Sequence, residues 1–192
     1  MRAQRSTKKD LRIAVAYHEA GHAVAACCLG IRVRYATIVP GDGLGGHVGI
    51  EREKLRTWIV IDRGERWHPS RFRAEKLVMF IQAGEVAQLR YDPRTLRPHH
   101  CLLDLNQCIA LLLHYVRRDA NPDSKPHYDL LYKWTDSLIE QQWHSVEAVA
   151  KALLDRHTLS RAQILDVIRS ADDEQRMKMV EAIRKQREEN DT

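Results

Sequence analysis

The sequence predicts an α+β fold that is mainly α-helical and contains one small β-sheet. Apolar residues recur at helical spacing over residues 10–29 and through most of the chain after residue 69. Between these stretches, residues 32–39 alternate in polarity and include β-branched side chains, which is typical of a strand. With 192 residues, 44% of them apolar, the chain can form one domain with a substantial core.

The first predicted helix, residues 10–29, contains the motif His-Glu-Ala-Gly-His at residues 18–22. Residues four apart lie on one face of a helix, so the two imidazoles could bind a single Zn²⁺. Glu19 could then take a proton from a water molecule that the metal activates. Histidines packed in a core are the alternative, but a Glu between two His is costly to bury on a mostly apolar helix without a role. Gly30 is suited to ending this helix.

A small β element is predicted directly after the motif helix. The strand over residues 32–39 leads into a glycine-rich turn at residues 40–46, and residues 47–50 are predicted to be the return strand. The glycines of the turn match G-x-G-x-x-G, but a strand follows them where dinucleotide binding requires a helix. Residues 58–61 could form a third strand.

Helices are predicted for most of the remaining chain. One covers residues 70–91 and is ended by Asp92-Pro93, and another covers residues 101–118. Apolar positions between residues 130 and 153 predict a long helix or a broken pair. Ser160 and Gln163 form a capping box for a short helix. The charge-dense sequence beyond Asp172 predicts a frayed helix or disorder.

Composition and charge narrow the classes of partner and compartment. The net charge of +5 suggests nucleic acid, but acidic residues are interleaved with the basic ones of residues 51–76, and no nucleic-acid-binding module is present. No apolar run has the length of a membrane span, and no signal-peptide core follows the basic N-terminus. The four cysteines lack C-x-x-C spacing, which favours reduced thiols. We therefore expect a cytoplasmic protein without a nucleic-acid partner or membrane span.

The motif and its surroundings resemble the peptidase module of FtsH-type ATP-dependent zinc metalloproteases. Residues 16–24 and the strand-like residues 35–40 carry the resemblance, and residues 146–154 and 158–160 also fit it. The third zinc ligand of that family is an Asp far downstream, in a pattern like Asn-Asp-Leu-x-x-Ala, and Asp104 is the matching position.

The resemblance covers residues 10–170, between a basic arm at residues 1–9 and a charged tail at residues 171–192. It implies a zincin-like metallopeptidase domain with its small sheet after the HExxH helix. His18, His22 and Asp104 are then the Zn²⁺ ligands, and Glu19 is the catalytic base. The implied activity is zinc-dependent endopeptidase cleavage of unfolded or flexible polypeptides.

Two departures from the family bear on this hypothesis. No G-x-x-x-x-G-K-[ST] sequence is present, so the AAA ATPase half is missing and ATP dependence would require a separate ATPase partner. Gln88 and Leu89 stand where two acids are expected, which leaves open what orients the zinc ligands. The alternative is a non-catalytic interaction module that retains the fold and could retain the metal. A homo-oligomer also stays open.

Three further histidines have both a functional and a structural interpretation. His47 could assist an oxyanion, but a surface histidine in a hairpin is the simpler interpretation. His99 and His100 could bind metal, yet a polar loop before the Asp104 helix explains them equally well. The glycine-containing strand at residues 47–49 is the best candidate to bind an extended peptide, because glycine allows another backbone to approach closely.

Overall fold

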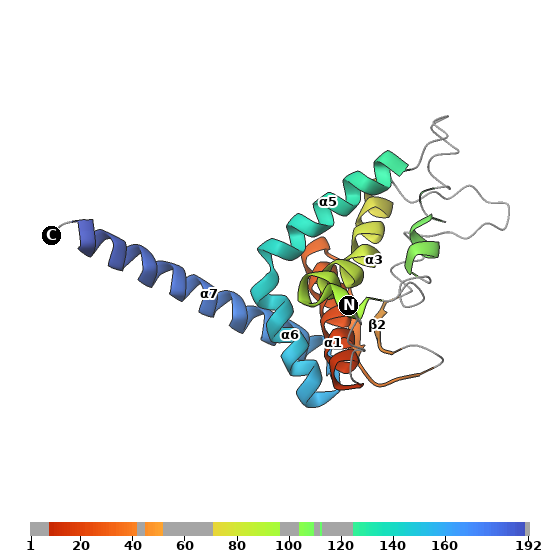
Figure 1. Ribbon diagram of the computed structural model, residues 1–192, viewed down its shortest axis with the longest axis horizontal. Coiled ribbons are helices and arrows are strands. Elements are labelled where there is room, and N and C mark those ends of the chain that lie inside the picture. The colour runs from red at the N-terminus through yellow and green to blue at the C-terminus, as the bar shows by residue number, and fades with distance from the viewer. Residues whose placement is uncertain are drawn as a thin grey trace, which may run out of the picture.

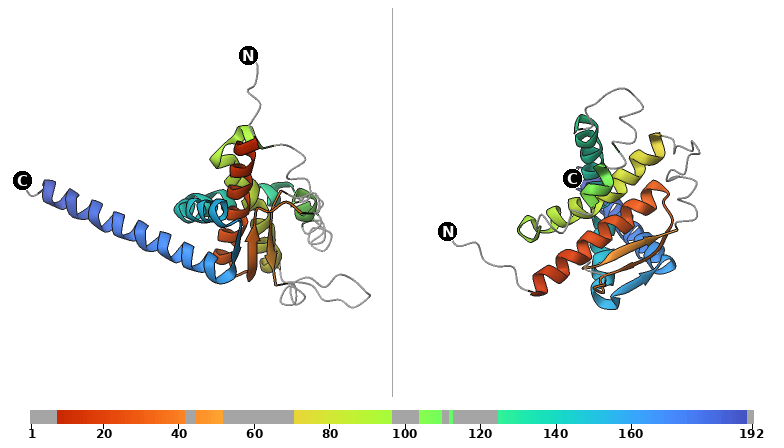
Figure 2. Two further views of the ribbon diagram at one scale, coloured as in Figure 1. Left: turned by 90° about the horizontal axis from the view of Figure 1, so that it is seen from below. Right: turned by 90° about the vertical axis from the view of Figure 1, so that its right-hand side faces the viewer.

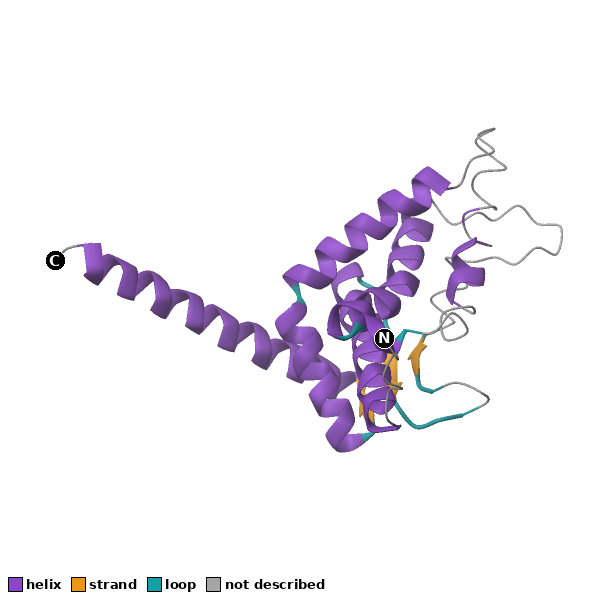
Figure 3. Ribbon diagram, viewed as in Figure 1, coloured by secondary structure: helices purple, strands orange, loops and turns teal. Residues whose placement is uncertain are grey.

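The fold is mainly helical and contains one small sheet (Figures 1 and 3). The computed structural model describes residues 8–41, 45–51, 71–96, 104–109, 112 and 125–190. The order of elements in these ranges is α1, Lys8–Leu29; β1, Val33–Thr37; β2, His47–Ile50; α3, Arg71–Tyr91; the 3-10 helix η1, Pro93–Thr95; α5, Lys125–Gln141; α6, Trp143–Arg156; β3, Thr158–Ser160; and α7, Arg161–Asn190.

Helix α1 is the central element. It packs against α3, α6 and the strands β1 and β2, and every residue from 19 to 26 is buried. A helix surrounded on all sides must have small or apolar residues around its whole circumference, and the alanines at positions 20, 23, 25 and 26 meet this requirement. Gly30 ends α1 at φ +74°. The N–H groups of Gly30 and Ile31 donate to Cys27 O and Ala26 O, closing the last turn as predicted.

The sheet is antiparallel, with strand order β2-β1-β3. Two of its strands, β1 and β2, confirm the predicted hairpin. Its third strand is β3, which pairs Leu159 with Ala36 although the two residues are far apart in sequence. This strand was not predicted from the sequence, because three residues are too few to show a period. The candidate strand at residues 58–61 lies outside the described residues.

Helix α3 ends where the sequence predicted. Asp92 caps η1 by accepting a hydrogen bond from Arg94 N, and Pro93 occupies its first turn. Of the predicted helix at residues 101–118, residues 104–109 and 112 are described, and they are helical. Cys108 and Leu112 are buried, whereas Leu105 and Ile109 are exposed. The inward face is therefore the one that carries Asp104 and Cys108.

The C-terminal helices differ from prediction mainly in length. The broken pair is α5 and α6, separated at Gln142. The capping box is confirmed, since Ser160 N donates to Gln163 Oε1 and Gln163 N donates to Ser160 Oγ. The helix that it begins is not short: α7 has 30 residues and projects away from the rest of the fold (Figures 1 and 2). Among the described residues, no helix combines the length and apolar character that a membrane crossing needs.

Candidate metal centre

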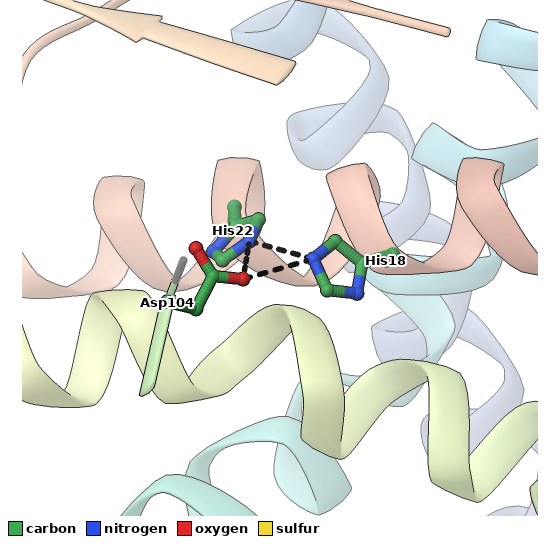
Figure 4. Close-up of side chains that lie close together, drawn as sticks. All are labelled: His18, His22 and Asp104. Atoms are coloured by element: carbon green, nitrogen blue, oxygen red, sulfur yellow. Dashed lines mark hydrogen bonds and ion pairs between the residues drawn. The ribbon is translucent and has the colours of Figure 1, made fainter. Parts of the chain in front are cut away.

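Three predicted ligands, two from α1 and one from a distant part of the chain, converge at one point (Figure 4). His18 Nε2 and His22 Nε2 are 3.1 Å apart. Asp104 Oδ2 lies 3.3 Å from the first nitrogen and 3.6 Å from the second. Ligand atoms about 2.0–2.1 Å from a tetrahedral Zn²⁺ lie about 3.3–3.4 Å from one another. The three observed distances therefore have the size expected for three corners of a zinc tetrahedron.

The opposite ring nitrogens of both histidines have fixed roles. His22 Nδ1 lies 2.8 Å from Phe80 O, and His18 Nδ1 lies 3.1 Å from Gln88 Oε1. Both partners are carbonyl oxygens, so each Nδ1 must carry a hydrogen and donate it. In the neutral rings, the Nε2 lone pairs then point toward each other and toward a carboxylate. Such an arrangement is repulsive unless a proton or a metal cation lies between the three atoms.

The orientation of the Gln88 amide is set by its other neighbour. Thr95 Oγ1 donates to Asp92 O at 2.7 Å, so toward Gln88 it can only accept. Gln88 Nε2 donates to it at 3.4 Å, which turns the amide oxygen toward His18. The sequence left open what orients the candidate ligands, and for His18 the group in contact with its Nδ1 is Gln88 itself. A neutral amide orients the ring in the way that carboxylates and backbone carbonyls often do at metal sites.

The charges of the site favour a cation between the ligands. Burial by itself would lower the pKa of His22, but the hydrogen bond to Asp104 and the charges of Asp104 and Glu19 raise it to about 9. Burial would raise the pKa of Asp104, yet hydrogen bonds from His18 and His22 bring it well below its usual value. Without a metal, a proton on His22 fills the role that a cation would otherwise fill.

Glu19 lies beside the ligands and is almost completely buried, with 5% of its surface exposed. Its Oε2 has no hydrogen-bond partner within the described ranges. Burial raises the pKa of this carboxyl group, and the nearby histidines oppose the rise. A buried carboxylate without a partner costs free energy. Its presence here therefore indicates a functional role. A raised pKa next to a candidate metal site is a common property of catalytic bases.

A close crossing of α1 and α3 gives the site its shape. A Cβ atom on Gly84 would lie 2.3 Å from His22 Nε2 and 2.6 Å from His18 Nε2. One on Gly21 would lie 2.4 Å from Ala83 O. Both glycines are therefore required for α3 to pass directly beside the imidazoles (Figure 4).

Cys108, one helical turn after Asp104, helps to hold Asp104 in position. Cys108 is buried, and its Sγ lies 3.9 Å from Val78 O of α3. Burial raises the pKa of the Cys108 thiol to about 12, so it stays protonated and does not compete as a thiolate ligand. Because Asp104 and Cys108 share one helical face, packing of the thiol against α3 directs the carboxylate toward the histidines.

Of the other candidate histidines, His47 is not one of the residues grouped at this centre. His47 is exposed, and its Nε2 lies 2.6 Å from the hydroxyl of Tyr35 on the neighbouring strand, which favours the surface interpretation. His99 and His100 lie outside the described residues.

No protein-family model matches this chain, and no curated protein sequence matches it. The likeness to the FtsH-type peptidase module therefore remains a prediction from the residues that carry it.

Proposed function

We propose that this chain is a zinc metalloendopeptidase with a zincin-like domain that resembles the peptidase module of FtsH-type proteases. Its proposed substrates are unfolded or flexible polypeptides. The observation that carries the proposal is the convergence of two imidazole nitrogens and one carboxylate oxygen beside a buried Glu19 that lacks a partner. The donor set of two His and one carboxylate is common for catalytic zinc, which keeps a fourth position open.

Each side chain has a distinct proposed role. His18, His22 and Asp104 would hold Zn²⁺, which supplies Lewis-acid chemistry by polarising a carbonyl group and making water more acidic. Glu19 would accept the proton of the attacking water and pass it to the leaving amine. Gln88 and the Phe80 carbonyl would keep the two imidazoles in the tautomer that leaves Nε2 free to bind metal.

The strand β2 is the proposed docking edge for substrate. It lies at one side of the sheet in the order β2-β1-β3, so its outer edge has no partner strand among the described residues. Gly46, directly before β2, packs on Glu19, since a Cβ there would lie 2.9 Å from Glu19 Oε1. A polypeptide added to this edge would run past the candidate catalytic carboxylate. Only a chain free to extend could bind in this way, which is why the proposed substrates are loosely structured.

The test combines metal analysis with cleavage of an unstructured protein, without ATP. We expect about one zinc per chain and cleavage that a chelator stops. Glu19→Gln should retain the zinc and lose the activity, because an amide cannot accept the proton from water. His22→Ala should lose nearly all the metal, and activity with it. Glu147→Gln makes the same chemical change at an exposed position of α6 and should leave both unchanged.

Three results would contradict the proposal. Equal cleavage by wild type and Glu19→Gln would show that a contaminant or another site acts. Full zinc occupancy without cleavage of any loosely structured substrate would favour the non-catalytic interaction module. Full zinc in His22→Ala would place the metal elsewhere.

A further inference from the structure

The second half of α7 exposes an apolar face. Every residue from 173 to 190 is exposed. Met177, Met179, Val180 and Ile183 are exposed by 68%, 65%, 58% and 47%. At 100° per residue, these four side chains fall within less than half of the helix circumference. An apolar stripe on a helix that projects into solvent normally indicates a surface that another element covers.

The base of α7 is anchored to the domain. A rigid α7 therefore cannot swing its apolar face onto that domain. Ile164 is fully buried. At Asp172, Oδ1 accepts hydrogen bonds from Ser145 Oγ at 2.9 Å and lies 2.8 Å from His144 Nε2. From this anchor the helix continues without a break to Asn190, away from the other elements (Figure 2). No described element of this chain covers the stripe, which favours a partner from another molecule.

The charges around the stripe identify what kind of partner fits. Asp173 and Arg187 lie seven residues before and after Val180, which is close to two turns, so all three share one line along the helix. More broadly, the sequence from 172 to 174 is acidic, and residues 184, 185 and 187 are basic. The helix thus carries opposite charges at equal distances from the centre of its apolar face.

We propose that a second copy of this chain packs antiparallel along α7, centred on Val180. In this orientation each Asp173 faces Arg187 of the other copy, whereas a parallel pair would place like charges opposite each other. The same arrangement also brings Arg176 of one copy opposite Arg184 of the other. Each of these arginines has a carboxylate on its own helix that offsets its charge: Asp173 lies 3.6 Å from Arg176, and Glu188 lies 3.0 Å from Arg184. Burial of the four apolar side chains drives the association, and the charges select its direction.

The experiment is sedimentation of the full chain over a range of concentrations. We expect a reversible monomer–dimer equilibrium. Val180→Glu/Ile183→Glu should weaken dimerisation by at least about tenfold, because carboxylates would meet in the apolar contact. Ala182→Glu adds the same group to an exposed position on the opposite face and should leave the equilibrium unchanged. Circular dichroism checks that each variant remains helical.

A charge exchange tests the direction. Asp173→Arg alone and Arg187→Asp alone should each weaken the dimer, and the double variant should restore it, because an antiparallel pair again faces opposite charges. A double variant as weak as the single ones contradicts the antiparallel arrangement. A wild type that stays monomeric at all concentrations overturns the proposal. Binding of such a monomer to anionic lipid vesicles would assign the face to a membrane surface instead.

Discussion

Helix α1 and the second half of α7 are both long helices, but their surroundings are opposite. Residues 19–26 of α1 are all buried, and α3 passes so close that glycine is required at the crossing. Residues 173–190 of α7 are all exposed, and ion pairs such as that between Glu174 and Lys178 at 2.7 Å join residues of the helix itself. Exposed pairs of this kind contribute little to stability.

The difference separates a packed region that can hold a metal site from an exposed helix face that can bind another molecule. The α1–α3 crossing is closely packed, so it can hold three ligand atoms within a few tenths of an ångström of their required separations. The projecting part of α7 offers no such constraint, but it presents a long face to another molecule.

Gly84→Ala should disrupt the candidate metal centre. The added Cβ would lie within 2.6 Å of both Nε2 atoms, so the helices must separate or the imidazoles must move. We expect the variant to lose zinc under conditions that saturate the wild type, and to lose about 1–3 kcal/mol of stability from overpacking. Metal analysis and denaturant unfolding measure the two effects.

Gly41→Ala is the matched control, because its added Cβ would meet nothing within 4 Å. It should leave zinc content and stability close to those of wild type. A Gly84→Ala protein that binds zinc as tightly as wild type would show that the crossing does not define the site.

Gln88→Leu should weaken zinc binding by about 10- to 100-fold, because loss of the group that orients a metal-binding His typically has this effect. His18 Nδ1 would lose its acceptor, and the ring would be free to rotate or change tautomer. Gln88→Glu keeps an acceptor at the same position and should retain the metal. Competition with a chromophoric chelator measures the affinities. Equal affinity in wild type and Gln88→Leu would remove Gln88 from the site.

Zinc affinity should rise with pH up to about 9. The pKa of His22 is raised to about 9 in the metal-free protein, so at pH 7 this ring carries a proton that zinc must displace. We expect release of about one proton per zinc at pH 7 and about a tenfold gain in affinity per pH unit below pH 9. Calorimetry in two buffers of different ionisation enthalpy counts the protons. Binding that is independent of pH would contradict a ligand role for His22.

The raised pKa of His22 also predicts how the stability of the metal-free protein depends on pH. Because the folded-state pKa of His22 lies above its ordinary value of 6.5, its contribution is fully present below about pH 6.5 and is lost as pH rises through 9. Asp104 has a lowered pKa, so its contribution is present above its ordinary value of 3.8 and is lost in acid. The metal-free protein should therefore lose stability between pH 6.5 and 9, and bound zinc should oppose this loss.

The features of the fold and site that could be predicted are those that depend on residues close together in the sequence. The motif helix, its end at Gly30, the β1–β2 hairpin and the capping box at Ser160 follow from residues a few positions apart, and all were predicted. The approach of Asp104 to the histidines was expected only from a family resemblance. No period or spacing connects positions so distant in sequence.

The supporting groups of the site could not be predicted from residue type. Phe80 contributes its backbone carbonyl, which every residue possesses, and Gly84 contributes the absence of a side chain. By residue type, Gln88 is a weaker partner for a histidine than an acid, and only its hydrogen bond to Thr95 shows which way the amide oxygen faces.

The length of α7 was also not predicted, because its charge-dense composition resembles that of a disordered tail. Its repeated pairs between carboxylates and basic side chains three or four residues apart are the signal that could have indicated a helix.

The smallest expected effect compares one chemical change in two helices. Val149→Ala in α6 removes two methyl groups from a fully buried site and should cost about 1–3 kcal/mol of stability. Val180→Ala in α7 makes the same change at a residue that is 58% exposed, and alanine favours helix over valine by a few tenths of a kcal/mol. In dilute protein, where self-association is absent, Val180→Ala should therefore be neutral or slightly stabilising. Denaturant unfolding of both variants checks this. A loss at Val180 comparable to that at Val149 would mean that the chain covers the apolar face of α7 itself, which would erase the contrast between the two helices.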